Sequence, residues 1–527
     1  MKVIFKMSPI IKQGWTLTDL SPVLLLAVFL IFAEYKSWSS HWLIIKSYRI
    51  IGKKKVFRKK TIKDVPGPYS LPIFGTRWLY SKFGGYRMNK IHELYADMFE
   101  KYGGIVREEA LWNFPVVSIK QRDDIEIVLK QSSKFPFRPP NEVTSYYRKT
   151  RPEKYTNLGL VNEQGETWHH LRNTLTPSLT SVQTMIRFLP ELNQVADDFN
   201  TLITNSRQEN GVVHSFEELA NRMGLESTCT LILGRRLGFL EQEVNPVASR
   251  LADAVKAQFI SSRDTFYGLP FWKMFRTPAY DRLVESEDTI YEIISEMVDE
   301  ARRDESEKAA VDPVQTVFMS ILKAEGLELC DKKAAIIDFI AAGIKTLGNT
   351  LVFLLYLVAK HPEVQEKIYE ELNELISDGC PLMTGTLKNA KYLRACIMEA
   401  FRVLPTAPCV ARILESETEL SGYTLPAGSV VLCHTWLASQ EESNFPDAKE
   451  FKPERWLNDS KEPFLVCPFG VGRRMCPGKR FVELELQVVL AQTVRKFHID
   501  FDEELDLQFE FLLAPKSPTN IILRDRH

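Results

Sequence analysis

The stretch PFGVGRRMCPGKRF, residues 468–481, decides the fold of this chain. Its glycines permit backbone conformations and close approaches that side chains prevent. Cys476 stands directly before Pro477, and proline favours the first position of a helix, so the pattern predicts an amphipathic helix over residues 477–496. A cysteine at a helix start faces free N–H groups and the positive end of the helix dipole. Both effects lower the pKa of the thiol and favour a thiolate that could bind a metal.

A free cysteine is more often a small buried hydrophobe, and we expect that of the other seven cysteines, Cys467 included. The eight cysteines contain no CxxC pair and are too dilute for a disulfide scaffold or a structural zinc site. The local pattern FxxGxRxCxG is far more specific, and it consists of Phe469, Gly472, Arg474, Cys476 and Gly478. This pattern resembles that of the cytochrome P450 family of haem-thiolate monooxygenases. The resemblance implies haem b as cofactor, with Cys476 as the axial ligand of the iron, Phe469 in the haem-binding loop and Arg474 at a propionate.

A second motif stands earlier in the chain. Glu399 and Arg402 are three residues apart and therefore share one helix face, and FKPERW supplies Arg455 further on. Alone, such a pair would be a surface ion pair. The resemblance implies a structural triad that braces the haem pocket, because buried charges are tolerated only when they satisfy one another.

Further arginines are expected at the haem. Trp168 and Arg172 in WHHLR resemble the residues that bind a propionate in the family, and Arg412 in APCVARIL is similar to another such arginine. Two carboxylates beside an apolar ring require several cationic donors, so more than one arginine is expected. Which of these arginines makes the contact stays open.

Residues Asp331–Lys360, followed by Pro362, predict one long helix that contains AAGIKTLGNT. Gly343 in a helix interior costs about 1 kcal/mol relative to alanine, so we expect it to leave room beside the helix backbone for another group. The resemblance implies that this group is dioxygen and substrate. The resemblance makes Thr346 the alcohol of a proton relay, although a helix threonine can simply bond its own backbone. Lys345 stands where the family carries an acid. We expect Lys345 to turn away from the haem and to pair with a carboxylate or water.

The amino-acid composition and the periodicity of apolar residues indicate the architecture of the chain. The chain has 527 residues, with 45% hydrophobic and 26% charged, which excludes a disordered, collagen-like or polytopic membrane protein. The 67 basic and 68 acidic residues give no sign of nucleic-acid binding. Residues 104–119 alternate like paired strands around a turn, residues 180–400 have helical periodicity, and β-like segments return at 418–434 and in the last thirty residues. We therefore predict a mainly α fold with a small β portion, in a single cytochrome P450 domain.

The N-terminal part differs from this body. An uninterrupted apolar run, Val23–Ala33, precedes a basic segment, residues 36–63, that contains no acidic residue. The run is shorter than the roughly 20 residues of a spanning helix, and positive charge favours anionic headgroups or import machinery. We expect residues 1–64 to be a membrane or targeting segment and residues 65–527 to be the haem-thiolate monooxygenase domain, joined by a stiff proline-rich tether, VPGPYSLPIFG. A buried core helix and a cleavable transit peptide are the alternatives.

Finer resemblance points to the mitochondrial-type branch of the family, through FRPPNEVTSYYRKTRPEKYTNLGL before Trp168 and KRFVELEL after the cysteine. That branch implies a ferredoxin as electron donor, docked through Arg394, Lys479 and Arg480, and a place at the inner mitochondrial membrane. Met398 stands where the branch carries a second basic residue on the ExxR helix. A flavin reductase and the endoplasmic reticulum membrane are the alternatives.

The resemblance implies that one oxygen atom from O₂ enters a C–H bond of an apolar, steroid-like substrate. The string GIKTLGNT is similar to that of insect steroid hydroxylases, which implies 20-hydroxylation of ecdysone to 20-hydroxyecdysone. Three alternatives stay open: a broad-specificity detoxifying monooxygenase, a haem-thiolate isomerase or dehydratase, and a non-catalytic haem sensor. The missing acid beside Thr346 keeps the isomerase or dehydratase open.

Overall fold

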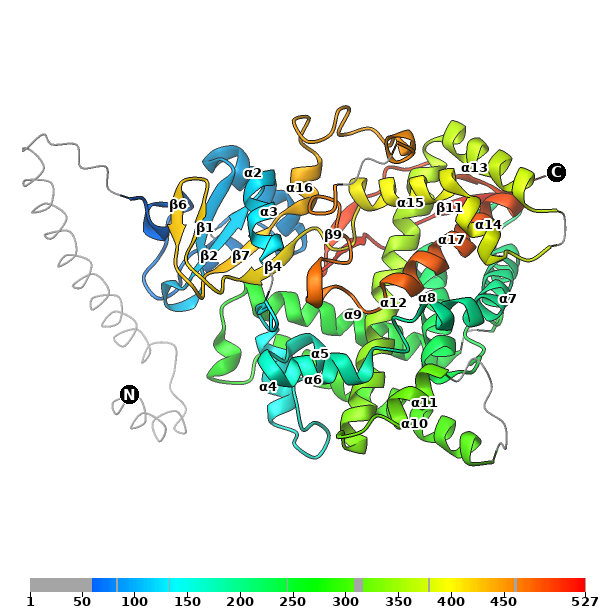
Figure 1. The fold of residues 1–527 in the computed structure, drawn as a ribbon, viewed down its shortest axis with the longest axis horizontal. Helices are drawn as coiled ribbons and strands as arrows, with labels where there is room; N and C mark the ends of the chain where they lie inside the picture. Colours follow the sequence, from blue (N-terminus) through cyan, green and yellow to red (C-terminus); the bar gives the residue numbers. More distant parts are fainter. Residues whose placement is uncertain are drawn as a thin grey trace, which may run out of the picture. The chain divides into compact units, whose positions relative to one another are not determined.

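The computed structural model describes residues 59–526, apart from 82–83, 132, 244, 308–315, 378–379 and 459–461. The predictions for the apolar run Val23–Ala33, and for the basic segment as far as residue 58, lie outside these residues. Within the described part, a strand-rich portion with α2 and α3 is grouped apart from the larger set of helices (Figure 1). The predicted mainly α fold with a small β portion is confirmed.

Helices account for most of the body. In chain order they are α2 (Ile91–Tyr102), α3 (Arg122–Lys130), α4 (Glu142–Lys149), α5 (Gly159–Asn162), α6 (Gly165–Leu175), α7 (Val182–Ser206), α8 (Phe216–Leu233), α9 (Pro246–Tyr267), α10 (Pro278–Glu307), α11 (Thr316–Leu322), α12 (Leu329–Ala359), α13 (Pro362–Leu375), α14 (Thr384–Asn389), α15 (Lys391–Val403), α16 (Thr435–Ser439) and α17 (Lys479–Lys496). The helical periodicity predicted for residues 180–400 is confirmed. Pro362 opens α13, so the long helix ends where the sequence predicted.

The strands form small sheets. They are β1 (Ile105–Glu109), β2 (Pro115–Ile119), β3 (Val212–Val213), β4 (Val410–Ile413), β5 (Thr418–Leu420), β6 (Tyr423–Leu425), β7 (Val430–Cys433), β8 (Phe497–Asp500), β9 (Leu507–Phe509), β10 (Leu513–Pro515) and β11 (Ile521–Asp525). The described sheets have the orders β1-β2-β7-β4, β3-β11-β8, β10-β9 and β5-β6. The strands β1 and β2 pair antiparallel, with Ile105 opposite Ile119, which confirms the pairing predicted for residues 104–119.

The proline-rich segment before β1 is part of the body. The Arg107 N–H donates to the Pro66 carbonyl at 2.7 Å, and the Thr76 N–H donates to the Glu109 carbonyl at 2.8 Å. These bonds hold residues 66–76 along β1, so the segment is not the separate tether that its prolines predicted. The proline rings do fix an extended backbone, and the edge of β1 supplies the partner for the Pro66 carbonyl.

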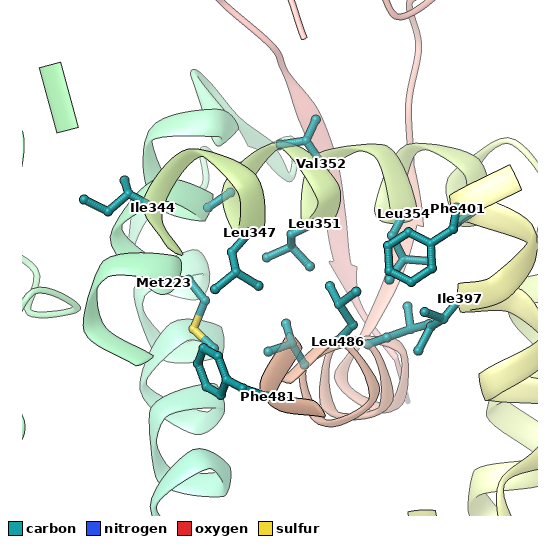
Figure 2. Close-up of a cluster of buried hydrophobic side chains, with 14 of the residues drawn as sticks. Met223, Ile344, Leu347, Leu351, Val352, Leu354, Ile397, Phe401, Phe481 and Leu486 are labelled. Carbon is teal, nitrogen blue, oxygen red and sulfur yellow. The ribbon is translucent and has the colours of Figure 1, made fainter. Parts of the chain in front are cut away.

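The core of the helical part lies where α12 crosses α17. Leu347 and Leu351 of α12 are directed toward Leu486 of α17, with Met223 of α8 beside them and Phe401 of α15 further along (Figure 2). All of these side chains are buried. Each fully buried leucine contributes about 1.5–3 kcal/mol, so this cluster fixes α12 relative to the middle of α17.

Two glycines of α12 permit close packing against α8. A Cβ atom at Gly343 would overlap the Thr228 hydroxyl, and one at Gly348 would overlap the Asn221 side chain. The expectation that Gly343 leaves room for dioxygen and substrate is therefore wrong. The missing Cβ lets two helices approach, and the periodicity of one helix could not reveal which neighbour fills that space.

Among the described helices, α12 is the one whose length and composition would suit a membrane span, with a mean hydropathy of 1.5. In its most apolar 18-residue stretch, 78% of the stretch is buried inside the protein. This burial identifies α12 as a core helix, since helices that are apolar all round are found in the cores of large proteins as well as in membranes.

Candidate functional site

The loop before α17 presents Cys476. Gly470 and Gly472 both have φ near +70°, a conformation that side chains disfavour. The Cys476 N–H donates to the Phe469 carbonyl at 2.8 Å and closes the loop. Pro477 and Gly478 form a turn, so the helix begins at Lys479 and not at residue 477 as predicted.

The Cys476 side chain is exposed, whereas Cys467 is buried. Although solvent reaches the Cys476 side chain, protein groups surround it on most sides, and this partial desolvation raises the pKa of the thiol, while the Gly478 N–H and the Arg172 charge act to lower it. The net lowering of the pKa predicted from the helix start is therefore wrong, because desolvation outweighs those effects. A coordinated metal ion deprotonates such a thiol outright.

Four arginines gather around this loop: Arg138, Arg172, Arg412 and Arg474. Burial, together with the neighbouring guanidinium groups, lowers the pKa of Arg138 to about 10 and that of Arg474 to about 9. Burial also lowers the pKa of Arg172 and of Arg412. Like charges this close repel one another, so the cluster is suited to a ligand that carries negative charge.

Arg474 is held firmly within the cluster. Its Nε donates to the Pro136 carbonyl at 2.9 Å and its Nη2 donates to Gln164 Oε1 at 2.8 Å. Its guanidinium lies over the Trp168 ring, 4.0 Å from the centroid, and Trp168 is itself buried. The remaining nitrogen, Nη1, is buried and has no hydrogen-bond partner in the described part of the chain. An unpartnered guanidinium nitrogen in this position fits an anionic acceptor such as a propionate.

Arg138 and Arg412 donate hydrogen bonds to neutral backbone carbonyls. Arg412 Nη2 donates to the Val471 carbonyl at 3.0 Å, and Arg138 Nη2 donates to the Val161 carbonyl at 2.7 Å. These bonds orient the two side chains, but a neutral carbonyl does not compensate the positive charge of a guanidinium group. Arg138 was not among the haem-binding residues predicted from the sequence. Its signal is FRPP, an arginine in an apolar segment whose prolines fix an extended backbone.

The ExxR helix is α15, and its charged residues lie together. Glu399 and Arg402 are essentially fully buried, and Arg402 Nη2 donates to Glu399 Oε1 at 2.7 Å. Arg455 Nε donates to the same oxygen at 2.9 Å, and Trp456 Nε1 donates to Glu399 Oε2 at 2.7 Å. One turn of α15 also carries Phe401, whose ring meets Phe469 edge-on at 5.3 Å. The buried ion cluster therefore supports the helix against which the cysteine loop packs.

These residues fit a haem. The described residues contain no group of three or more His, Cys, Asp or Glu side chains placed to bind a metal ion. Haem needs only one or two protein ligands, since the porphyrin supplies the other four, and Cys476 provides a thiolate. The arginine cluster supplies cations for two propionates.

On α12, the Thr346 hydroxyl donates to the Ala342 carbonyl at 2.6 Å. Ala342 is exposed and Thr346 is half-buried, although most of their helix neighbours are buried. Lys345 is buried, and burial lowers the pKa of its ammonium while the Glu510 carboxylate raises it. Adjacent helix residues point about 100° apart, so Lys345 and Thr346 lie on different faces of α12.

The family model for cytochrome P450 matches residues 65–523. The chain belongs to the cytochrome P450 family. It is 47% identical over 486 residues to the ecdysone 20-monooxygenase of Drosophila melanogaster, a match that covers 89% of this chain and 90% of that protein.

More distant relatives carry mitochondrial names. This P450 is 30% identical over 480 residues to "Cytochrome P450 302a1, mitochondrial" of D. melanogaster, covering 89% of this chain and 96% of that protein. It is 28% identical over 443 residues to "1,25-dihydroxyvitamin D(3) 24-hydroxylase, mitochondrial" of Mus musculus, covering 84% of each. The chain is therefore a monooxygenase that uses haem with a cysteine thiolate as axial ligand.

The residues predicted to dock an electron donor lie on two helices of this P450. Arg394 is half-buried on α15. Lys479 lies 3.7 Å from Glu483 within α17, and Arg480 donates to the Thr180 carbonyl. In the described residues no hydrogen bond or ion pair joins Arg394 of α15 to Lys479 or Arg480 of α17. A docking surface that includes all three residues would therefore not depend on a bond between them.

Proposed function

We propose that this P450 hydroxylates ecdysone at carbon 20 to give 20-hydroxyecdysone. The observation that carries the proposal is the 47% identity to a D. melanogaster enzyme of that name, spread over 486 residues and nearly the whole of both chains. The described site supports it with a thiol in a glycine-rich loop, four clustered arginines and a threonine on a core helix.

In this proposal Cys476 would bind the haem iron through its thiolate, and Phe469 belongs to the same loop, with its ring edge-on to Phe401 of α15. Arg172, Arg412 and Arg474 would hold the propionates, with Trp168 beneath the Arg474 guanidinium and Arg138 as a fourth cation. When bound, the haem activates O₂ for insertion of one oxygen atom into a C–H bond, and the thiolate favours O–O cleavage. The other oxygen leaves as water, which requires two electrons and two protons.

Thr346 and an ordered water would pass the protons for this step, one at a time. The Thr346 hydroxyl proton engages the Ala342 carbonyl at 2.6 Å, which leaves its oxygen free to accept a hydrogen bond from this water. When the hydroxyl rotates and gives its proton onward, this water returns a proton to the threonine oxygen, so Thr346 is left unchanged. Lys345 lies on another face of the helix and organises this region indirectly.

Thr346→Ala is expected to uncouple oxygen consumption from hydroxylation. Loss of a positioned proton donor lowers the rate of steroid hydroxylation on the order of 100-fold, while NAD(P)H and O₂ are still consumed and hydrogen peroxide appears instead. The ratio of peroxide to hydroxylated steroid measures this directly. Thr346→Ser keeps the hydroxyl and is the matched control, so it should stay coupled. A fully coupled Thr346→Ala enzyme contradicts the relay.

The substrate is tested with a panel of ecdysteroids and unrelated apolar drugs titrated into the purified holoenzyme. Ecdysone should displace the axial water and shift the iron spin state, and turnover should yield 20-hydroxyecdysone only when O₂ is present. Equal responses to unrelated drugs would favour a detoxifying enzyme. Product formed without O₂ would favour an isomerase or dehydratase, and either result overturns the proposal.

We further propose that a small ferredoxin delivers the electrons and that the enzyme resides at the inner mitochondrial membrane, with residues 1–64 as its targeting or anchor segment. The support is the mitochondrial names of several relatives, including those that are 30% and 28% identical. The first 63 residues carry a net charge of about +11 against −1 for the whole chain, so residues 64–527 are acidic at about −12. Any positive docking surface on this body must therefore be local.

Arg394→Glu is expected to raise the ferredoxin concentration needed for half-maximal rate about ten-fold, because it places a negative charge where an acidic donor docks. The effect should shrink with added salt. Steady-state rates at several ferredoxin concentrations measure it, and Lys388→Glu on the neighbouring helix α14 is the matched control. Equal rates with a flavin reductase alone would instead place the enzyme at the endoplasmic reticulum.

A further inference from the structure

The side chain of Gln164, the residue directly before helix α6, does not cap that helix. The backbone of Gln164 has the extended conformation of an N-cap residue, with φ −128° and ψ 166°, but its side chain makes no capping hydrogen bond. Serine, threonine, aspartate and asparagine usually fill this position, because their short side chains reach the free N–H groups of the first turn. The Gln164 amide is therefore available for other partners.

The Gln164 amide joins Arg474 to the segment that carries Arg138. Gln164 Oε1 accepts a hydrogen bond from Arg474 Nη2 at 2.8 Å and a longer one from the Arg138 N–H at 3.4 Å. Gln164 Nε2 donates to the Arg138 carbonyl at 3.0 Å and to the Asn162 carbonyl at 3.1 Å. The oxygen and the nitrogen of this amide are thus both engaged, and each of them contacts the residues of the arginine cluster.

Two segments of chain contact the same guanidinium group of Arg474. In the first segment, residues 136–138, the Pro136 carbonyl accepts a hydrogen bond from Arg474 Nε at 2.9 Å. In the second segment, residues 161–164, the Glu163 carbonyl accepts a hydrogen bond from Arg474 Nη2 at 2.8 Å. The glutamine amide at the end of the second segment also bonds to the first one, so it fixes the distance between the groups that hold the arginine.

An amide suits this position better than a carboxylate. A glutamate side chain would accept a hydrogen bond from Arg474, but when ionised it could not donate to the two backbone carbonyls, and it would neutralise the guanidinium charge. The amide accepts the same hydrogen bond and leaves that charge uncompensated. The neighbouring Glu163 carboxylate favours the charged form of Arg474, but its Oε1 accepts the Leu158 N–H at 2.8 Å.

We propose that Gln164 is a positioning residue for the haem propionates: its amide fixes Arg474 beside Arg138 and leaves the Nη1 group and the full charge of Arg474 for a propionate. This inference rests on the proposed contact between Arg474 and a propionate. Burial and the Arg138 charge both disfavour the charged form of Arg474, so without these bonds the two guanidinium groups would move apart. Gln164 acts through Arg474 and not on the iron or the substrate.

Two substitutions in the purified holoenzyme separate the position of Arg474 from its charge. Gln164→Met removes the hydrogen bonds but keeps the charge, so transfer of haem to excess apomyoglobin should become about ten-fold faster while the reduction potential stays close to the wild-type value. Gln164→Glu neutralises Arg474, which makes addition of an electron to the iron less favourable. It should lower the potential by about 59 mV, a ten-fold change in the equilibrium constant of a one-electron couple.

Gln492→Glu is the matched control, because it places the same charge at another half-buried glutamine. Gln492 Nε2 donates to Asn193 Oδ1 at 3.1 Å, and Gln492 lies about 20 Å along α17 from the cysteine loop. It should change neither the haem transfer nor the potential. A merely structural role of Gln164 would lower the free energy of unfolding of both Gln164 variants but would leave the potential of Gln164→Glu unchanged, and that result overturns the proposal.

A double-mutant cycle shows whether Gln164 acts through Arg474. Arg474→Gln alone should speed haem transfer and lower the potential, and in that background Gln164→Met should have no further effect on transfer. If Arg474→Gln changes neither quantity, the propionate contact is wrong and the role of Gln164 is overturned with it. If Arg474→Gln acts but both Gln164 variants match wild type, or if the effect of Gln164→Met persists in the Arg474→Gln background, only the role of Gln164 is overturned. These measurements need no steroid, so they are independent of the proposed substrate.

Discussion

Cys476→Ser is expected to abolish the red-shifted Soret band of the reduced carbon monoxide complex and, with it, steroid hydroxylation. A serine hydroxyl does not supply the electron-rich thiolate that this band reports, and it is a far weaker ligand for iron. The loop itself should survive, because its closing bond runs between the backbone N–H of residue 476 and the Phe469 carbonyl. The measurement is the difference spectrum of purified protein after reduction and addition of carbon monoxide.

Cys467→Ala is the matched control for that variant. Cys467 lies in the same segment but is buried at 8% exposure, and burial raises the pKa of its thiol to about 11. Its replacement should leave the band in place. An unchanged band in Cys476→Ser, or a lost band in Cys467→Ala, would show that the axial ligand has been assigned to the wrong cysteine.

Glu399→Gln is expected to be the most destabilising single change in the body. The substitution keeps the shape of the side chain but removes the charge that Arg402 and Arg455 both contact, at 2.7 and 2.9 Å. Breaking a buried ion pair from one side typically costs about 3–5 kcal/mol, because the remaining charge is left uncompensated. We expect a lower free energy of unfolding and poor haem incorporation, measured by denaturant unfolding and by the ratio of haem to protein.

The control for this prediction is Glu454→Gln, which also removes a glutamate charge paired with a basic residue. Its partner, Lys367, is about half exposed, so the loss should stay below about 1 kcal/mol. If Glu399→Gln and Glu454→Gln were equally stable, the buried cluster would not carry the stability ascribed to it.

Local sequence pattern determined the cysteine loop, the spacing of the ExxR pair and several of the secondary-structure elements of this protein. The glycines and the cysteine of residues 468–481, the spacing of Glu399 and Arg402, and the alternation of residues 104–119 are each set within a few residues of chain. Such features follow from steric limits and from the periods of helices and strands, which do not depend on the rest of the fold. The length of α12 was predictable for the same reason, since Pro362 opens the next helix and ends this one.

Only the tertiary structure decided which distant residues meet. Arg138 lies in one cluster with Arg172, Arg412 and Arg474, although these residues come from separate parts of the chain. The local sequence FRPP does not predict this cluster. Gly343 serves contact with Thr228 of α8, and the charge of Glu510, more than a hundred residues later in the chain, acts on the buried Lys345 ammonium. Periodicity tells which face of a helix is buried, but not what covers it. Tertiary packing determines the partner, because a buried charge or a close helix approach is stable only next to a neighbour of complementary charge or shape, and the whole fold places that neighbour.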